Sequence, residues 1–250
     1  MKHRLLSLVT VFSIAFFIHT TPSNAQAFID VETGALFPGY NDVRIPGDAG
    51  TLVSLTSDLD VNSSVFYRIR AGYTINSKHT ISVLYAPLTV KPSGSVNFPI
   101  AFEGELFPAN TLLDASYKFN SYRITYRYDF VRNPKFQFGL GLTGKIRDAE
   151  IELVSDNLSA KKENVGFVPL INFRLHWAFH EKIGLLFQGD ALAAKQGRAE
   201  DVMLAGTYKF SDQAVMRLGY RILEGGADND EVYNFSLFHY ATLGVSYTFK

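Results

Sequence analysis

Ser121–Phe130, with the sequence S-Y-R-I-T-Y-R-Y-D-F, alternates strictly between polar and apolar side chains. The apolar positions are Tyr122, Ile124, Tyr126, Tyr128 and Phe130, and the polar positions are Ser121, Arg123, Thr125, Arg127 and Asp129. Because successive side chains of a β-strand point to opposite faces, this stretch predicts a strand with one apolar face and one charged face. Either the charged face meets bulk water, as in a soluble sandwich, or the apolar face meets lipid and the charged face lines a lumen.

The same alternation recurs along the chain and predicts about ten strands. These are Phe28–Phe37, Ser64–Ile75, His79–Pro87, Leu112–Phe130, Phe136–Ile146, Phe167–Trp177, Ile183–Ala193, Val202–Phe210, Met216–Ile222 and Tyr233–Phe249. Within the fourth strand, the alternation of Leu112–Phe119 is one residue out of phase with that of Tyr122–Phe130. A β-bulge near Asn120 would reconcile the two halves, so we predict one there.

The connections between these strands differ in length on alternate sides. Those after the second, fourth, sixth and eighth strands are tight turns. Those after the odd strands are predicted to be longer loops: Pro38–Asn62, Leu88–Thr111, Ser155–Asn164, Lys195–Asp201 and Glu224–Glu231. Short periplasmic turns with longer outer loops are typical of membrane barrels. The sequence therefore predicts an all-β fold, a transmembrane antiparallel up-and-down β-barrel of about 10 strands, with 8 or 12 as alternatives.

The composition agrees with this class. The chain has 250 residues, no cysteine and zero formal net charge, and it contains 13 tyrosines and 21 phenylalanines. The absence of cysteine excludes disulfides and thiolate metal sites, and the neutral charge gives no argument for nucleic acid. Aromatic girdles at the two membrane interfaces would account for the many aromatic residues.

The N-terminal residues have the features of a secretory signal peptide. A charged start at Lys2–Arg4 is followed by the apolar Leu5–Ile18, and small residues then precede Ala25 and Ala27. We predict a signal peptide over residues 1–25, with cleavage after 27 as an alternative, and a barrel domain over 26–250. Export would use the Sec pathway. No later stretch approaches the ~20 apolar residues of a membrane helix.

The closing strand carries a more specific motif. Thr242–Phe249, T-L-G-V-S-Y-T-F, resembles the C-terminal assembly signal of bacterial outer-membrane β-barrels, with Thr242, Gly244, Tyr247 and Phe249 at the matching positions. Lys250 departs from the pattern, since many members end on the aromatic residue. The resemblance implies that the protein lies in the outer membrane of a Gram-negative bacterium. It also implies partners: barrel-assembly machinery, periplasmic chaperones, and the surrounding lipid and lipopolysaccharide. We expect a monomer.

The predicted lumen is rich in charge. Its basic residues are Arg68, Arg70, Arg123, Arg127, Lys145, Arg147, Arg174, Arg217 and Arg221, and its acids are Asp30, Glu32, Asp129 and Asp190. One interpretation is an internal salt-bridge network that plugs a narrow barrel. The other is a basic conduit for anions, in which guanidinium groups such as those of Arg123 and Arg127 lack carboxylate partners. A barrel of about ten strands is barely wider than one filled by its own side chains, which favours the plug.

Other candidate sites are weaker. We expect His176 to join the lumen network and His239, which falls on the apolar face, to be rotated inward by a bulge around Ala241–Thr242. Asp228–Glu231 offers oxygen ligands, but it lacks the spacing of a calcium loop and is predicted to be a solvated turn. We predict no catalytic residues, no metal site and no cofactor.

The function that these features favour is a structural or narrow porin-like outer-membrane barrel with an Arg-rich lumen. One alternative is an outer-membrane enzyme acting on lipid A or peptides at the outer rim, although the sequence has no nucleophile elbow or Asp-x-His pair. Another is a surface adhesin or binding protein that acts through its outer loops.

Overall fold

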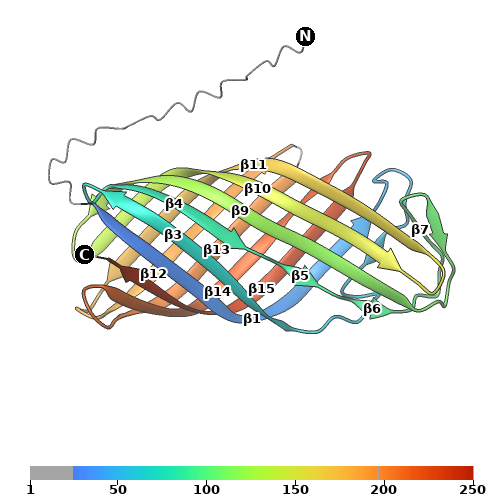
Figure 1. The fold of residues 1–250 in the computed structure, drawn as a ribbon, viewed down its shortest axis with the longest axis horizontal. Coiled ribbons are helices and arrows are strands. Elements are labelled where there is room, and N and C mark those ends of the chain that lie inside the picture. The colour runs from blue at the N-terminus through green and yellow to red at the C-terminus, as the bar shows by residue number, and fades with distance from the viewer. Residues whose placement is uncertain (1–24, 196, 250) are drawn as a thin grey trace, which may run out of the picture.

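The computed structural model describes residues 25–195 and 197–249, so most of the predicted signal peptide lies outside the described residues. Ten long antiparallel strands form the wall. They are β1 (Gln26–Arg44), β3 (Ser64–Ile75), β4 (His79–Ala86), β9 (Leu113–Arg132), β10 (Phe136–Val154), β11 (Ser159–Ala178), β12 (Ile183–Ala194), β13 (Gly197–Lys209), β14 (Ala214–Asp228) and β15 (Tyr233–Thr248). Each strand pairs with its neighbours in the chain, and β15 pairs with β1, which closes an up-and-down barrel (Figure 1). The predicted fold class is confirmed.

The turns at the end that carries Gln26 and Phe249 are tight, as predicted. They follow β3, β9, β11 and β13. At the opposite end, only the connections of residues 45–63 and 87–112 are long. The prediction of long loops at 155–164, 195–201 and 224–231 was wrong, because most of these residues continue β10–β11, β12–β13 and β14–β15 as strand hairpins. Their polar composition reflects strands that run into water rather than loops.

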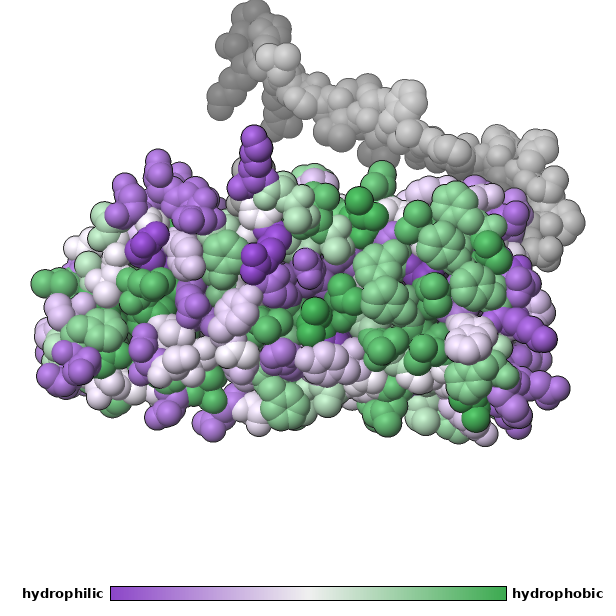
Figure 2. Space-filling view, turned by 180° about the vertical axis from the view of Figure 1, so that it is seen from behind, coloured by the Kyte–Doolittle hydropathy of each residue, from purple (hydrophilic) through white to green (hydrophobic). Residues whose placement is uncertain are grey.

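An apolar belt surrounds the half of the barrel nearest the tight turns. Large apolar side chains point outward there on every long strand. Examples are Val31, Tyr67, Val83, Ile124, Leu142, Ile171, Phe187, Leu204, Leu218 and Val245. Figure 2 shows apolar side chains gathered over that half of the visible face, with polar residues at both ends. Such a surface is suited to lipid and not to water.

No helix among the described residues is long and apolar enough to cross a membrane.

The apolar side chains of β9 change from the outer face to the inner face where the strand leaves the belt. Its register with β10 is continuous from Asp114 to Val131, apart from a shift at Phe138/Gly139 of the partner. The odd-numbered side chains therefore face inward throughout, from Leu113 and Tyr117 to Arg123. The predicted bulge near Asn120 is absent. The apparent change of phase arises because the upper interior is apolar while the upper exterior meets water.

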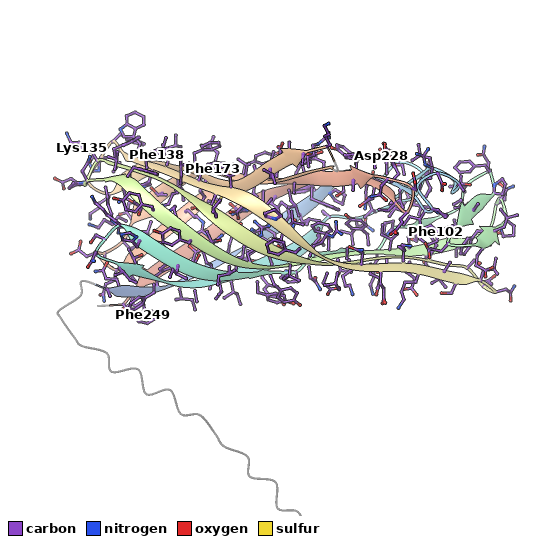
Figure 3. All side chains as sticks on the ribbon, turned by 90° about the horizontal axis from the view of Figure 1, so that it is seen from above. Phe102, Lys135, Phe138, Phe173, Asp228 and Phe249 are labelled. Carbon is purple, nitrogen blue, oxygen red and sulfur yellow. The ribbon has the colours of Figure 1, made fainter. Side chains whose placement is uncertain are left out.

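The upper interior is filled by a cap built from the two long connections. Five short strands lie in these connections. β2 (Val53–Ser54) pairs with β1, and β5 (Thr89–Val90) and β6 (Ser93–Gly94) pair with β9, whereas β7 (Ile100–Phe102) and β8 (Glu105–Phe107) form a separate two-stranded sheet. Phe102 and Phe107 of the cap pack with wall residues such as Tyr117 and Phe238 in one hydrophobic core. Figure 3 shows Phe102 at the end opposite Lys135 and Phe249.

His239 stays on the outer face, contrary to prediction. The ladder between β14 and β15 runs through Ile222–His239 and Tyr220–Ala241 without a bulge. The imidazole is hydrogen-bonded to the hydroxyl of Tyr220 instead. A partner on the same face thus satisfies the ring nitrogen, and no rotation of the strand is needed. The bulge of this region lies in β1, between Pro38 and Tyr40.

Candidate functional site: the lumen charge cluster

Eight charged residues cross the middle of the barrel. We call them the lumen charge cluster: Asp30, Glu32, Arg68, Arg123, Asp190, Asp201, Arg217 and Arg221. All except Asp30 are buried. Four guanidinium groups meet four carboxylates, so the cluster is neutral as a whole. Its members come from β1, β3, β9, β12, β13 and β14, and they therefore tie opposite walls together.

Asp201 and Glu32 are the two hubs of this cluster. Asp201 accepts hydrogen bonds or ion pairs from Arg68 at 2.7 Å, from Arg123 at 2.6 Å, and from Arg221. Glu32 accepts from Arg217 at 2.9 Å and from Arg221 at 2.8 Å. Such short charge-assisted contacts compensate for burying ionised groups, which would otherwise be prohibitive.

Asp190 extends the cluster to two more strands. It pairs with Arg123 at 2.7 Å and accepts hydrogen bonds from Thr143 at 2.7 Å and Asn172 at 2.8 Å. Arg123 also donates from its Nε to Ser121. Hydroxyl and amide groups of β10 and β11 thus complete the barrier across the lumen.

Asp201 is the member that the sequence reasoning missed. It was placed in a loop over 195–201, whereas the structure has it inside β13 with its side chain directed inward. The signal that could have found it is the alternation Asp201, Met203, Ala205 and Thr207, which shares one face of the strand. With Asp201 included, Arg123 pairs with two carboxylates, so the unpaired guanidinium of the conduit interpretation is not found at this residue.

The other predicted lumen residues lie outside the cluster. Arg127 pairs with Asp129 at 2.9 Å, and Asp129 also accepts from Arg132. Arg70 donates to Ser82 and Arg174 to Gln188. His176 contacts Thr207 and lies near Arg174 without joining the cluster. Lys145 and Arg147 lie higher on β10, where no carboxylate of the described residues comes within 4 Å of them.

The assembly motif is tied to the cluster through Gly244. A Cβ placed on Gly244 would lie 2.5 Å from Cζ of Arg217, which is held by Asp30 and Glu32. Glycine at this position therefore makes room for a buried guanidinium. Thr242 is buried in the same row, whereas Tyr247 and Phe249 lie outside on the belt, with ring centroids 5.1 Å apart.

A second barrier lies above the cluster. Tyr117 is the largest fully buried side chain there, and its hydroxyl contacts Asn234 and Ser236. It lies beyond the apolar belt, where burial raises the pKa of Tyr117 to about 12, partly offset by the hydrogen bond to Ser236. The phenol therefore stays neutral at physiological pH and acts as a packing and hydrogen-bonding group.

A cavity with a volume of about 520 Å³ lies between this core and the wall. Cavities next to the charge cluster are far smaller, about 60 Å³ beside Arg70 and Arg174 and about 10 Å³ beside Arg123. The space in the barrel is thus concentrated in its outer half.

Within the described ranges, the histidines do not form an acid–base constellation. His79 bonds to Tyr126, His176 to Thr207 and His239 to Tyr220. No group of three or more His, Cys, Asp or Glu is arranged to hold a metal ion in the part of the chain that the structure describes. Asn229 of the predicted 228–231 turn instead accepts backbone hydrogen bonds from Glu231 and Val232.

Comparisons with known proteins give a fold but no sequence family. No protein-family model matches the chain. No curated protein matches it either. Among solved structures, the outer membrane protease OmpT of Escherichia coli superposes with a TM-score of 0.58 over 92% of this chain and 99% of its own, at 9% identity. The chain has the fold of the bacterial outer-membrane β-barrels.

Two further outer-membrane β-barrels show weaker likeness. Ail, the attachment invasion locus protein of Yersinia pestis, has a TM-score of 0.41 and 11% identity, covering 90% of this chain and 99% of its own. The COG4313 outer membrane channel of Pseudomonas putida F1 has a TM-score of 0.44 and 9% identity, covering 90% and 96%. The apolar belt around the tight-turn half of the barrel is a surface suited to a lipid bilayer.

Proposed function

We propose that this outer-membrane barrel is a closed, non-conducting protein rather than a pore. The observation that carries the proposal is the lumen charge cluster, in which buried Arg68, Arg123 and Arg221 converge on Asp201. A conduit would need water or anions at unpaired guanidinium groups. Because these guanidinium groups pair with the carboxylates of the cluster, they do not need water or anions as partners.

The cap supports the same conclusion independently. Val43, Leu55, Phe102 and Phe107 are almost fully buried inside the outer half of the barrel. An ion that had passed the charge cluster would next have to cross this apolar core, where a bare charge is prohibitively costly. The two barriers are chemically different, so a single change in the lumen does not open both.

Reconstitution into planar bilayers tests the proposal. Wild-type protein should give no steady conductance, at neutral pH and moderate salt, because both barriers span the lumen. Arg132→Gln should behave like the wild type, since this arginine lies at the turn end and, among the described residues, its ion pair is with Asp129. A steady anion-selective current from pure wild-type protein would overturn the proposal and support the narrow porin-like alternative.

The other two functions that the sequence leaves open gain no specific support. His79, His176 and His239 are hydrogen-bonded to hydroxyl groups, and His180 accepts from the backbone N–H of Lys182. Apolar residues of the long connections are buried in the hydrophobic core of the outer half. We therefore propose the closed barrel alone.

A further inference from the structure

The barrel wall is uneven in height at its outer end. β10 and β11 pair with each other up to Val154 and Ser159, whereas the ladder between β11 and β12 stops at Ile171–Ala191. Residues 159–170 of β11 therefore have no strand partner on the β12 side among the described residues. Figures 1 and 3 show the β10–β11 hairpin extending well past the end of β12 and past Asp228 of β14. We call the space between residues 159–170, the β12–β13 tip and the end of β14 the wall notch.

The cavity of about 520 Å³ lies directly behind the wall notch. Its lining includes Phe167, Val168 and Pro169 on one side of the notch and Leu192, Ala194 and Gly197 on the other. Pro169 has no backbone N–H to donate, which suits it to an unpaired strand edge. The cavity falls within the roughly 300–1,000 Å³ of small-molecule sites.

The cap roofs the cavity and is fixed on both sides of the notch. Lys162 of β11 pairs with Glu103 of the cap at 3.1 Å. On the other side, the backbone N–H of Gly47 donates to the carbonyl of Asp230 at 2.9 Å. Ile45, whose carbonyl accepts from Glu103, lines the cavity from above. With the roof held at both sides, the notch is the side from which a molecule in the outer leaflet would reach the cavity.

Two cations in this cavity have no carboxylate partner. Lys145 is only 2% exposed, and its ammonium lies 4.5 Å from the centroid of the Phe119 ring. Arg147, two residues further on the same face of β10, donates to Asn164, and its buried Nε has no hydrogen-bond partner within the described residues. The neighbouring cations Lys162 and Arg198 are paired with Glu103 and Glu224. Arg147 thus carries a positive charge that no ion pair among the described residues neutralises, and an anion in the cavity would also favour the charged form of Lys145.

We infer that this cavity binds an amphiphile with a single anionic head group, held by Lys145 and Arg147. Carboxylate, sulfate and phosphate monoester groups share the required chemistry, because each accepts charge-assisted hydrogen bonds from ammonium and guanidinium donors. The apolar tail lies against Phe119, Leu192 and Leu223 and leaves through the wall notch. The notch begins beside outward-facing Phe167 and Ile171, at the upper edge of the apolar belt, so the tail would enter from the outer leaflet.

The test uses protein in nanodiscs of phosphatidylcholine, with binding of a dansyl-labelled undecanoate measured against empty nanodiscs. Dodecanoate and dodecyl phosphate should displace the probe, whereas dodecanol should do so at least about tenfold less well and dodecylammonium not at all. Lys145→Gln with Arg147→Gln should weaken the two anions by about tenfold or more and leave dodecanol unchanged. Arg174→Gln, a lumen arginine also without a carboxylate partner, is the matched control and should change nothing.

A second measurement follows the route of the tail. The chain has no native cysteine, so Ala194→Cys at the notch and Ala71→Cys on the opposite outer face can each carry one environment-sensitive fluorophore. Dodecanoate should change the signal at position 194 and not at 71. Phosphatidic acid, added to the nanodiscs, distinguishes a membrane lipid from a free amphiphile. It displaces the probe if the site accepts a two-chain lipid and leaves the probe bound if the site accepts single-chain amphiphiles alone. No binding above empty nanodiscs, binding that ignores the charge of Lys145 and Arg147, or equal signals at both labels would overturn the inference.

Discussion

The carboxylate of Asp201 contacts Arg68, Arg123 and Arg221, three guanidinium groups from three different strands. Each of these arginines keeps its charge under any physiological condition, because a guanidinium does not lose its proton. Removing the central carboxylate therefore leaves positive charges close together without compensation. At the scale of a single residue, Asp201 thus links β13 to three other strands of the wall.

Asp201→Asn should lower stability strongly, since removing one partner of a buried ion pair costs ~3–5 kcal/mol. The measurement is the temperature at which the folded band of an unheated gel sample shifts to the unfolded position. Glu200→Gln is the control, because Glu200 lies next in sequence on the opposite, outer face of β13. Equal shifts for the two variants, or none for Asp201→Asn, would contradict the role given to this carboxylate.

The sequence predicts the individual lumen residues unevenly. Arg123 and Arg217 are predicted correctly, because each lies between two apolar residues of a strand and must therefore point to the face opposite the lipid. Asp201 does not, because Arg198, Glu200 and Asp201 lie close together and resemble a solvated loop. The pairing itself cannot be read from the chain, since partners such as Arg68 and Asp201 are brought together only by closure of the barrel.

At the scale of an element, the surroundings of both faces of β9 change along the strand, while its side chains alternate without interruption from Leu113 to Asp129. Its outer face carries Phe130 and Ile124 in the belt and Ser116 and Asp114 above it, while its inner face carries Arg123 below and apolar side chains above. A period-two pattern identifies the strand correctly. It does not reveal which side is lipid, because that requires knowing where the bilayer ends, and the bulge expected at Asn120 was wrong for this reason.

The boundary on β9 can be tested with one substitution made at two heights. Ile124→Lys puts a charge on the lipid face and should destabilise the barrel by about 2–4 kcal/mol, the cost measured for cations near the bilayer midplane. Ser116→Lys places the same side chain on the same face above the belt and should cost little. Chemical unfolding in lipid vesicles gives both values, and similar losses would show that the belt extends further than Ile124.

At the scale of the molecule, the two barriers are independent structures. The charge cluster belongs to the strands inside the belt, and the apolar core belongs to the outer wall and the cap. The sequence therefore predicts the charge cluster but not the apolar core above it. The alternating strands reveal the lower barrier, whereas the connections look like polar loops until Phe102 and Phe107 are seen inside the barrel.

Excising the outer part of the cap separates the two barriers. The N–H of Asn110 donates to the carbonyl of Val96 at 2.7 Å, so residues 97–109 can be replaced by a two-residue Asn-Gly turn. This variant should melt at a lower temperature, because it loses Ile100, Phe102 and Phe107 from the core. It should still conduct no ions, because the charge cluster is untouched. Appearance of a current would mean that the cap is the main barrier.

The uneven rim gives this barrel a front and a back. A cylinder of equal strands offers the same wall to neighbours in every direction, but here β9–β11 stand high and the β12–β13 hairpin stands low. Rotation of the protein about its own axis therefore changes what adjoining lipids and proteins encounter. In a crowded membrane, a neighbouring protein bound at the β12–β13 side would cover the wall notch, whereas one bound at the β9–β11 side would leave the notch accessible. Entry of an amphiphile through the wall notch would then depend on how the barrel is oriented relative to its neighbours.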